Sequence, residues 1–154
     1  MQLTLAVVGR AHDGTFGAAI ADYERRITHY WPLVVKEVKE AGGRGVAPAV
    51  TRRTEGERLL DVCLTRGEVV ACDERGSVMT SAAFAEWLGR IRDSAGAVTF
   101  VIGGAYGLDD AVHARATRRL AVAPWTLPHE MARLVLVEQL YRAGTLLRGE
   151  PYHK

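Results

Sequence analysis

The sequence predicts an α/β fold, in which a mainly parallel sheet carries helices on both faces. Short apolar runs typical of strands alternate along the whole chain with segments whose apolar residues recur at helical spacing. Several of the strand-like runs end in loops rich in glycine, proline or acidic residues, and parallel sheets bind their ligands at such ends. The 154 residues contain no linker and no internal repeat, so we expect a single domain over 1–154.

The first half of the chain is expected to form three strands and two helices. Its strands are short apolar runs rich in valine and leucine, and its first helix has aromatic and aliphatic residues at helical spacing. A glycine-rich stretch after the second strand predicts a loop. In chain order we expect a strand at 3–8, a helix at 13–30, a strand at 33–38, a helix at 51–64 and a strand at 68–72.

The second half continues the alternation. Ser81 is expected to cap a helix, acidic residues suit the start of a short helix, and a proline lies in the first turn of the last helix. In chain order we expect a helix at 81–92, a strand at 98–102, a short helix from 109, a strand at 120–123 and a helix at 128–147.

The last helix has apolar side chains around much of its circumference. This breadth predicts burial on more than one side, which a subunit interface would provide. Glu138 and Arg142 stand four residues apart and predict an ordinary ion pair, and a buried Arg142 would need an anion beside it. The apolar residues are Met131, Leu134, Val135, Leu140 and Tyr141.

Composition indicates a globular protein, with 48% hydrophobic and 25% charged residues. Apolar runs stay below the roughly 18 residues needed to span a bilayer, so we expect no membrane segment, and the N-terminus resembles a strand more than a signal peptide. The two cysteines lack metal-ligand or redox spacing, so we expect a cytoplasmic location. The net charge of +2 is too small to establish nucleic-acid binding, and the basic residues equally suit solvated faces.

Three predicted strands lead into loops that are candidates for a pocket. Gly103, Gly104 and Gly107 follow one strand, where they allow close backbone approach to a ligand or simply make a tight turn with positive φ. Asp73 follows Cys72 at the end of another strand, where it can contact a ribose or form an Asx turn. Neither the G-x-G-x-x-G pattern nor a Walker lysine is present.

The third loop, 123–128, contains two prolines. Its stiff backbone leaves carbonyls free for an exocyclic amine such as that of adenine, although a rigid connection with a helix cap at Thr126 explains the prolines equally well. The chain then ends in Tyr152, His153 and Lys154, which combine an aromatic ring, an imidazole and a cation. Such a tail is often disordered, but these side chains also suit an RNA base.

Four segments, in order and at the expected separations, resemble the ribosomal RNA large subunit methyltransferase H family of SPOUT-class enzymes. The likeness covers the whole chain and rests on 103–108 (GGAYGL), 126–129 (TLPH), 138–143 (EQLYRA) and 151–154 (PYHK). It implies an α/β fold with a C-terminal trefoil knot, a homodimer, and transfer of a methyl group from S-adenosylmethionine to N3 of a pseudouridine in large-subunit rRNA.

The resemblance also implies roles for individual residues. Catalysis would involve Arg142, Tyr152, His153 and Glu138, and Tyr152, His153 and Lys154 would bind the substrate RNA. The cofactor-binding residues would be Cys72, Asp73, Gly103, Gly104, Ala123, Pro124, Trp125, Thr126, Leu127 and Pro128. The family's usual Gly-Gly-Pro-Glu-Gly is Gly-Gly-Ala-Tyr-Gly here, and Cys72 stands where leucine is usual.

Methyl transfer by in-line displacement requires no metal, and we expect none. Arg142 would stabilise negative charge on the base, His153 would accept the N3 proton, and Tyr152 would stack on the base. Three alternatives remain open: an RNA-binding or ribosome-associated protein without catalysis, a nicotinamide-dependent oxidoreductase, and a methyltransferase acting on another RNA such as a tRNA.

Overall fold

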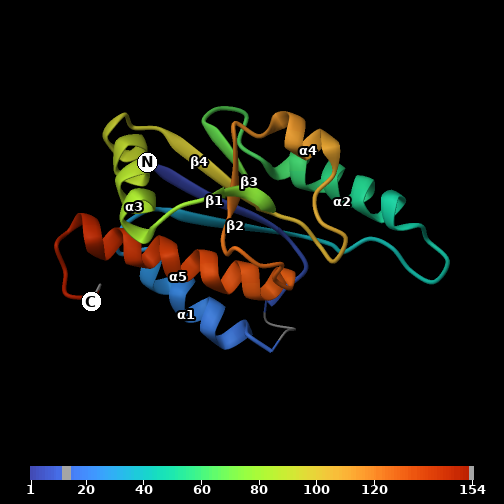
Figure 1. The fold of residues 1–154 in the computed structure, drawn as a ribbon, viewed down its shortest axis with the longest axis horizontal. Helices are drawn as coiled ribbons and strands as arrows, with labels where there is room; N and C mark the ends of the chain where they lie inside the picture. Colours follow the sequence, from blue (N-terminus) through green and yellow to red (C-terminus); the bar gives the residue numbers. More distant parts are fainter. Residues whose placement is uncertain (12–14, 153–154) are drawn as a thin grey trace.

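Five parallel strands form one sheet in the order β2-β1-β4-β3-β5 (Figure 1). The computed structural model describes residues 1–11 and 15–152, and this sheet confirms the predicted α/β class. The two central apolar runs, β1 and β4, lie side by side and are covered on both faces. The strands are β1 Gln2–Val8, β2 Leu33–Val38, β3 Glu68–Val78, β4 Ala97–Ile102 and β5 Arg118–Ala121.

Helices cover both faces of the sheet, as predicted. The helices are α1 Gly17–Ile27, α2 Pro48–Val62, α3 Ser81–Asp93, α4 Asp110–Arg115 and α5 His129–Leu147. Helices α1, α3 and α5 pack on one face, and α2 and α4 on the other (Figure 1). Because side chains alternate along a strand, Leu3 and Leu5 of β1 pack into the core under α1, α3 and α5, whereas Ala6 and Val8 pack into the core under α2 and α4.

Strand β3 is longer than the predicted strand at 68–72. Its apolar run ends near Cys72, but its backbone pairs again with β5 at Ser77 and Val78, after a shift in register. Gly76 allows this second pairing, since a Cβ there would lie 2.6 Å from the backbone carbon of Leu120. Hydrophobic patterning missed the extension because backbone pairing, and not side-chain burial, holds it.

The helix starts differ from those predicted by a few residues. Thr80, and not Ser81, caps α3, and its hydroxyl accepts a hydrogen bond from the backbone N–H of Ala83 at 3.1 Å. Pro128 is the residue before α5 and not part of its first turn, and Thr126 does not cap this helix. The predicted first helix at 13–30 is shorter, Gly17–Ile27, and its first two positions lie outside the described residues.

Helix α5 runs from the carboxyl edge of the sheet to its amino edge. It begins at His129, whose imidazole lies near Gly9 at the end of β1. Beyond its far end, the Arg148 guanidinium donates to the carbonyl of His29, shortly before β2 begins. Every residue of α5 is buried or half-buried, as the breadth of its apolar surface predicted, and α1, α3 and the sheet provide much of the covering within one chain.

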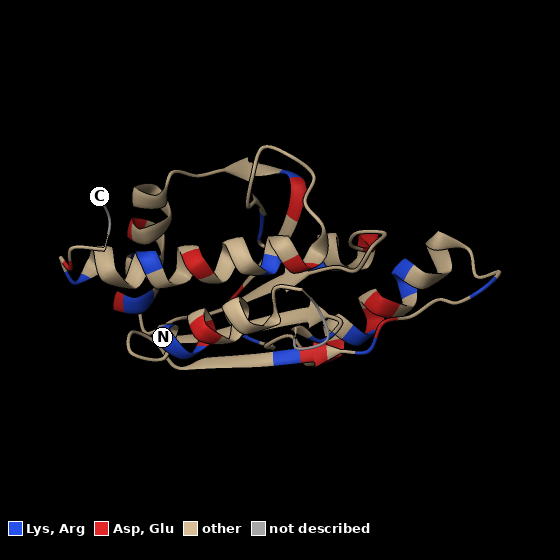
Figure 2. Cartoon of the chain, turned by 90° about the horizontal axis from the view of Figure 1, so that it is seen from below, with Lys and Arg blue, Asp and Glu red and all other residues tan. Residues whose placement is uncertain are grey.

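Charged residues of both signs are interspersed on the same helices and strands (Figure 2). Arg133 on α5 is 5% exposed and pairs with Glu24 of α1 at 2.7 Å and Glu37 of β2 at 2.8 Å. This buried ion pair fixes α5 against its neighbours. Among the described residues, no helix has the length and apolar character needed to cross a membrane.

Candidate functional site

A pocket of about 540 Å³ opens at the carboxyl edge of the sheet. Its walls come from the 72–75 stretch of β3, the 102–108 loop after β4 and the 122–127 loop after β5, with the first turn of α5 closing one side. The structure therefore brings together the three strand ends that the sequence singled out. Of the ten predicted cofactor residues, Pro124 and Pro128 do not line the pocket, whereas these eight do: Cys72, Asp73, Gly103, Gly104, Ala123, Trp125, Thr126 and Leu127.

The glycine loop is a tight turn and a pocket wall at once. The backbone N–H of Gly107 donates to the Gly104 carbonyl at 3.0 Å, and Gly107 has a φ of 78°. A Cβ on Gly103 would lie 2.7 Å from the Gly107 carbonyl, and one on Gly104 would lie 2.6 Å from Oε2 of Glu55. The tight turn with positive φ is confirmed, and the loop also lines the pocket, whereas close approach of its backbone to a ligand stays a prediction.

Asp73 is held in the pocket wall by contacts to both carboxylate oxygens. Oδ1 accepts from the backbone N–H of Arg75 at 2.8 Å, which is the predicted Asx turn, and Oδ2 lies 3.1 Å from Nε2 of buried His113 on α4. Burial alone would raise the pKa of Asp73, but the Arg75 hydrogen bonds outweigh it and the pKa lies below its usual value. Asp73 is therefore an ionised acceptor with lone pairs left for a ligand.

Several residues at the pocket were not found from the sequence. Arg52, Tyr106 and His129 line it, and Glu55 and His113 support its walls from behind. His113 carries no sequence signal, since its contact with Asp73 depends on how α4 packs against β3. Buried Glu55 accepts from the backbone N–H of Ala41 at 3.0 Å, and so joins the loop after β2 to the glycine loop.

Cys72 lies beside Asp73 as a free thiol in the pocket wall. Burial raises the pKa of this thiol to about 12, although a backbone hydrogen bond from Val101 partly opposes the shift. The group is therefore a neutral apolar contact at physiological pH and not a nucleophile. No group of three His, Cys, Asp or Glu within 1–11 and 15–152 is arranged to hold a metal ion.

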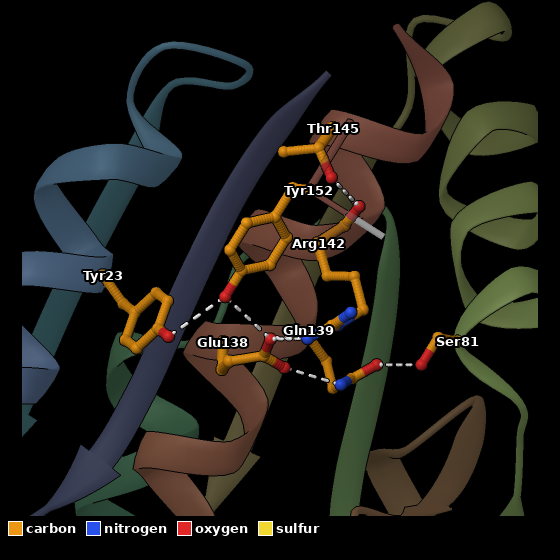
Figure 3. Close-up of polar contacts among 7 residues, drawn as sticks. All are labelled: Tyr23, Ser81, Glu138, Gln139, Arg142, Thr145 and Tyr152. Atoms are coloured by element: carbon orange, nitrogen blue, oxygen red, sulfur yellow. Dashed lines mark hydrogen bonds and ion pairs between the residues drawn. The ribbon is translucent and has the colours of Figure 1, made fainter. Parts of the chain in front are cut away.

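Three of the four predicted catalytic residues, Glu138, Arg142 and Tyr152, gather around the second half of α5 (Figure 3). Arg142 donates to Oε1 of Glu138 from Nε at 3.0 Å and from Nη2 at 2.6 Å, which confirms the predicted ion pair. The Tyr152 hydroxyl donates to the same oxygen at 3.2 Å and lies 3.1 Å from the Tyr23 hydroxyl. On the other side, Gln139 donates to Oε2 of Glu138 at 2.6 Å. The structure thus joins Glu138, Arg142 and Tyr152, while His153 and Lys154 lie outside the described residues.

The electrostatics of this cluster keep Arg142 charged and Tyr152 neutral. The hydrogen bond to Glu138 raises the pKa of Arg142, although partial burial opposes the shift. Burial, followed by the hydrogen bond with Tyr23, raises the pKa of Tyr152. The Arg142 guanidinium lies 4.8 Å from the centre of the Tyr152 ring. The result is a cation held over an aromatic ring and oriented by a carboxylate.

The pocket and this cluster lie toward opposite ends of α5. Ala132 lines the pocket, and Arg142 follows ten residues later, about 15 Å further along the helix axis. The tail also contacts the amino edge of the sheet, where Tyr30 donates to Glu150 at 2.5 Å. Within one chain, the predicted cofactor and catalytic groups are therefore separated.

Comparison with known proteins places the chain in a family. Residues 1–153 match a family described as predicted SPOUT methyltransferase. Three relatives are all named ribosomal RNA large subunit methyltransferase H. The protein from Gemmatimonas aurantiaca is 56% identical over 100% of both chains. That from Nitratidesulfovibrio vulgaris is 48% identical over 98% of this chain and 97% of its own, and that from an Anaeromyxobacter species is 47% identical over 100% of both.

Among solved structures, a probable methylase family protein from Haemophilus influenzae has a similar fold. The TM-score is 0.55 at 14% identity, and the match covers 99% of this chain and 70% of the other. This likeness concerns the fold alone. The match of the family over 1–153, and relatives at up to 56% identity over the full length, show that the chain belongs to the SPOUT methyltransferase family.

Proposed function

We propose that this chain transfers a methyl group from S-adenosylmethionine to N3 of a pseudouridine in large-subunit ribosomal RNA. One observation carries the proposal: the chain is 56% identical, over the full length of both proteins, to a relative named ribosomal RNA large subunit methyltransferase H. The pocket at the carboxyl edge of the sheet supports it independently, because it has the size and lining of a nucleotide-like cofactor site.

The donor would bind against the three loops of the pocket. Asp73 would accept hydrogen bonds from ribose hydroxyls, since its carboxylate is ionised and already oriented by Arg75 and His113. Gly103 and Gly104 line the pocket with backbone alone, because the space that a Cβ would fill is taken by the Gly107 carbonyl and the Glu55 carboxylate, so their backbone groups would contact the donor. The 123–128 loop would accept from the adenine amine through its carbonyls. When bound, the donor supplies an activated methyl group.

The cluster at the second half of α5 would act on the RNA. N3 of the base must lose its proton and become nucleophilic, and Arg142 would stabilise the negative charge that develops. Glu138 would hold the guanidinium in place through its two hydrogen bonds. Tyr152 would contact the base, His153 would accept the N3 proton and Lys154 would contact the RNA. Changing Arg142→Ala, or removing residues 152–154, should stop transfer while sparing cofactor affinity.

We infer that the working enzyme is a homodimer with composite sites. The pocket and the Arg142 cluster are separated by about 15 Å along α5. An antiparallel pairing of two copies would bring the cluster of one chain to the pocket of the other. Closed two-fold dimers are the commonest homo-oligomers. A self-complementary interface along the length of α5 and α1 would place the Arg142 cluster of each chain at the pocket of the other.

Mixed dimers test this arrangement directly. One chain would carry a pocket variant such as Gly103→Val, and the other would carry Arg142→Ala. Composite sites predict that the mixed dimer recovers one working site, so about half the wild-type activity, whereas each homodimer is inactive. Activity in neither the mixed nor the pure dimers, with folding intact, would mean that each site is built within one chain.

Three further features belong to this proposal. We expect 1–154 to work as one domain, in the cytoplasm, where ribosomes are the substrate. We also expect a trefoil knot at the C-terminal part; support comes from the 103–108 and 122–127 loops, which wall the same pocket just before α5. An experimental structure whose chain path is unknotted would remove that expectation. Methylation of tRNA by the purified enzyme would favour another RNA as substrate.

A further inference from the structure

One tryptophan stands apart from the other two. All three lie within the described residues; Trp31 and Trp87 are 3% and 4% exposed, whereas Trp125 is 74% exposed. The exposed indole belongs to the loop that lines the candidate cofactor pocket. An exposed indole beside a pocket is available to stack on a planar ligand.

The loop that carries Trp125 is anchored. Pro124 precedes the tryptophan and Pro128 follows it, and each proline fixes its own φ. Between them, the Thr126 hydroxyl donates to the carboxylate of Glu74 on β3. The indole is therefore presented by a restrained backbone, so less conformational entropy is lost when a ligand packs against it.

Side chains suited to RNA share the same pocket. Tyr106, in the glycine loop, is 51% exposed, and the Arg75 side chain is 76% exposed. Aromatic faces stack on unpaired bases, and guanidinium groups contact phosphates or stack in turn. Three acidic residues lie at the same pocket: Asp73 contacts Arg75 and His113, Glu74 accepts from Thr126, and Asp110 also lines the pocket. Two exposed aromatic side chains and a cation thus stand at the pocket where an RNA base has to arrive.

We propose that the Trp125 side chain stacks on an unpaired RNA base beside the target nucleotide. The inference rests on the proposed function, because that function brings single-stranded RNA to this pocket. In this arrangement the backbone of the 123–128 loop binds the methyl donor, and the indole of Trp125 binds the RNA. Trp125, which the family resemblance assigns to the cofactor, is then a substrate-binding residue.

Tryptophan fluorescence offers a direct test in the intact protein. Because Trp31 and Trp87 are buried, quenching by acrylamide should report mainly on Trp125. Ribosomal RNA absorbs strongly, so the RNA probe would be a short uridine-rich single strand at low absorbance, with S-adenosylhomocysteine as the cofactor probe. We expect the RNA to lower the quenching constant severalfold and S-adenosylhomocysteine to leave it nearly unchanged.

Kinetics with ribosomes that lack the modification provide the second readout. Stacking on an aromatic side chain is worth about five- to a hundredfold in affinity, so Trp125→Ala should raise KM for ribosomes by that factor. Trp125→Phe should recover most of the loss, and cofactor affinity should stay within about twofold in both variants. Val46→Ala provides a control, since Val46 is 41% exposed but does not line the pocket.

Three results would each overturn the proposal. Shielding of Trp125 by S-adenosylhomocysteine alone would assign the indole to the donor. Loss of the dimer in Trp125→Ala, measured by sedimentation, would assign it to a second copy of the chain. An unchanged KM for ribosomes in Trp125→Ala, together with no protection of Trp125 from acrylamide by RNA, would show that Trp125 does not bind the substrate. Wild-type methyl transfer in the same preparation would then leave the proposed function intact.

Discussion

Replacing Gly103 by alanine should weaken cofactor binding with little effect on the rest of the fold. A Cβ at this position would lie 2.7 Å from the carbonyl carbon and oxygen of Gly107, whereas ordinary contact begins at 3.4 Å. The loop would have to open by roughly 0.7 Å, the difference between these two distances. The two nearest atoms are backbone and cannot rotate away as a side chain can, and Cδ2 of Leu108 follows at 3.1 Å. Such overpacking costs about 1–3 kcal/mol.

If the donor binds only when the loop is in its observed position, the strain in Gly103→Ala weakens donor binding. A strain of about 1–3 kcal/mol that falls on the bound state raises Kd by about five- to a hundredfold. We would measure S-adenosylmethionine binding by titration calorimetry and Tm by circular dichroism. Gly43→Ala is the matched control, because a Cβ on Gly43 meets nothing within 4 Å and the residue has no positive φ. A Gly103→Ala protein that binds the donor as tightly as Gly43→Ala would refute the placement of the donor against this loop.

Three other predictions concern stability, ionisation and turnover. Arg133→Met leaves two carboxylates without their buried partner, which costs about 3–5 kcal/mol, so Tm should fall by about 6–20 °C. The exposed pair of Arg90 and Glu86 is the control, and Arg90→Met should move Tm by no more than about 2 °C; equal shifts would contradict the buried pair's importance. Burial raises the pKa of Tyr30 to about 12, so the stabilisation from its neutral hydroxyl is complete below pH 10 and is lost as pH rises toward 12. Comparing phenolate absorbance with that of Tyr30→Phe checks this, and a Tyr30 titration at or below pH 10 would be the contrary result. Glu138→Gln removes a charge-assisted contact worth about 1.5–3 kcal/mol, so turnover should drop by about ten- to a hundredfold with cofactor affinity unchanged, and a parallel loss of affinity would argue against a role in catalysis.

The order of elements and the location of the pocket were predictable from local patterns. Alternating apolar runs and helical periodicity predicted every strand and helix in sequence, because burial on a parallel sheet imposes these periods. The three loops could be grouped without knowledge of contacts, since the carboxyl ends of parallel strands share one edge. Asp73 and Gly103 were singled out on this ground, and both line the pocket.

What the sequence did not predict depends on long-range contact. His113 stands opposite Asp73 only because α4 packs beside β3, and no local pattern marks that pairing. The extension of β3 past Cys72 is held by backbone pairing with β5, which side-chain hydrophobicity does not report. The distance between Tyr152 and the pocket depends on the direction of α5 across the sheet, which no local pattern in the sequence predicts.

Methyl transfer to ribosomes tests the central claim most directly. Ribosomes and naked large-subunit RNA lacking the modification would be incubated with labelled S-adenosylmethionine, and the product nucleoside identified by mass spectrometry. We predict N3-methylpseudouridine on ribosomes, with the label lost in Arg142→Ala. Intact cofactor binding without transfer to either RNA would contradict the proposed function and would point to another RNA as substrate.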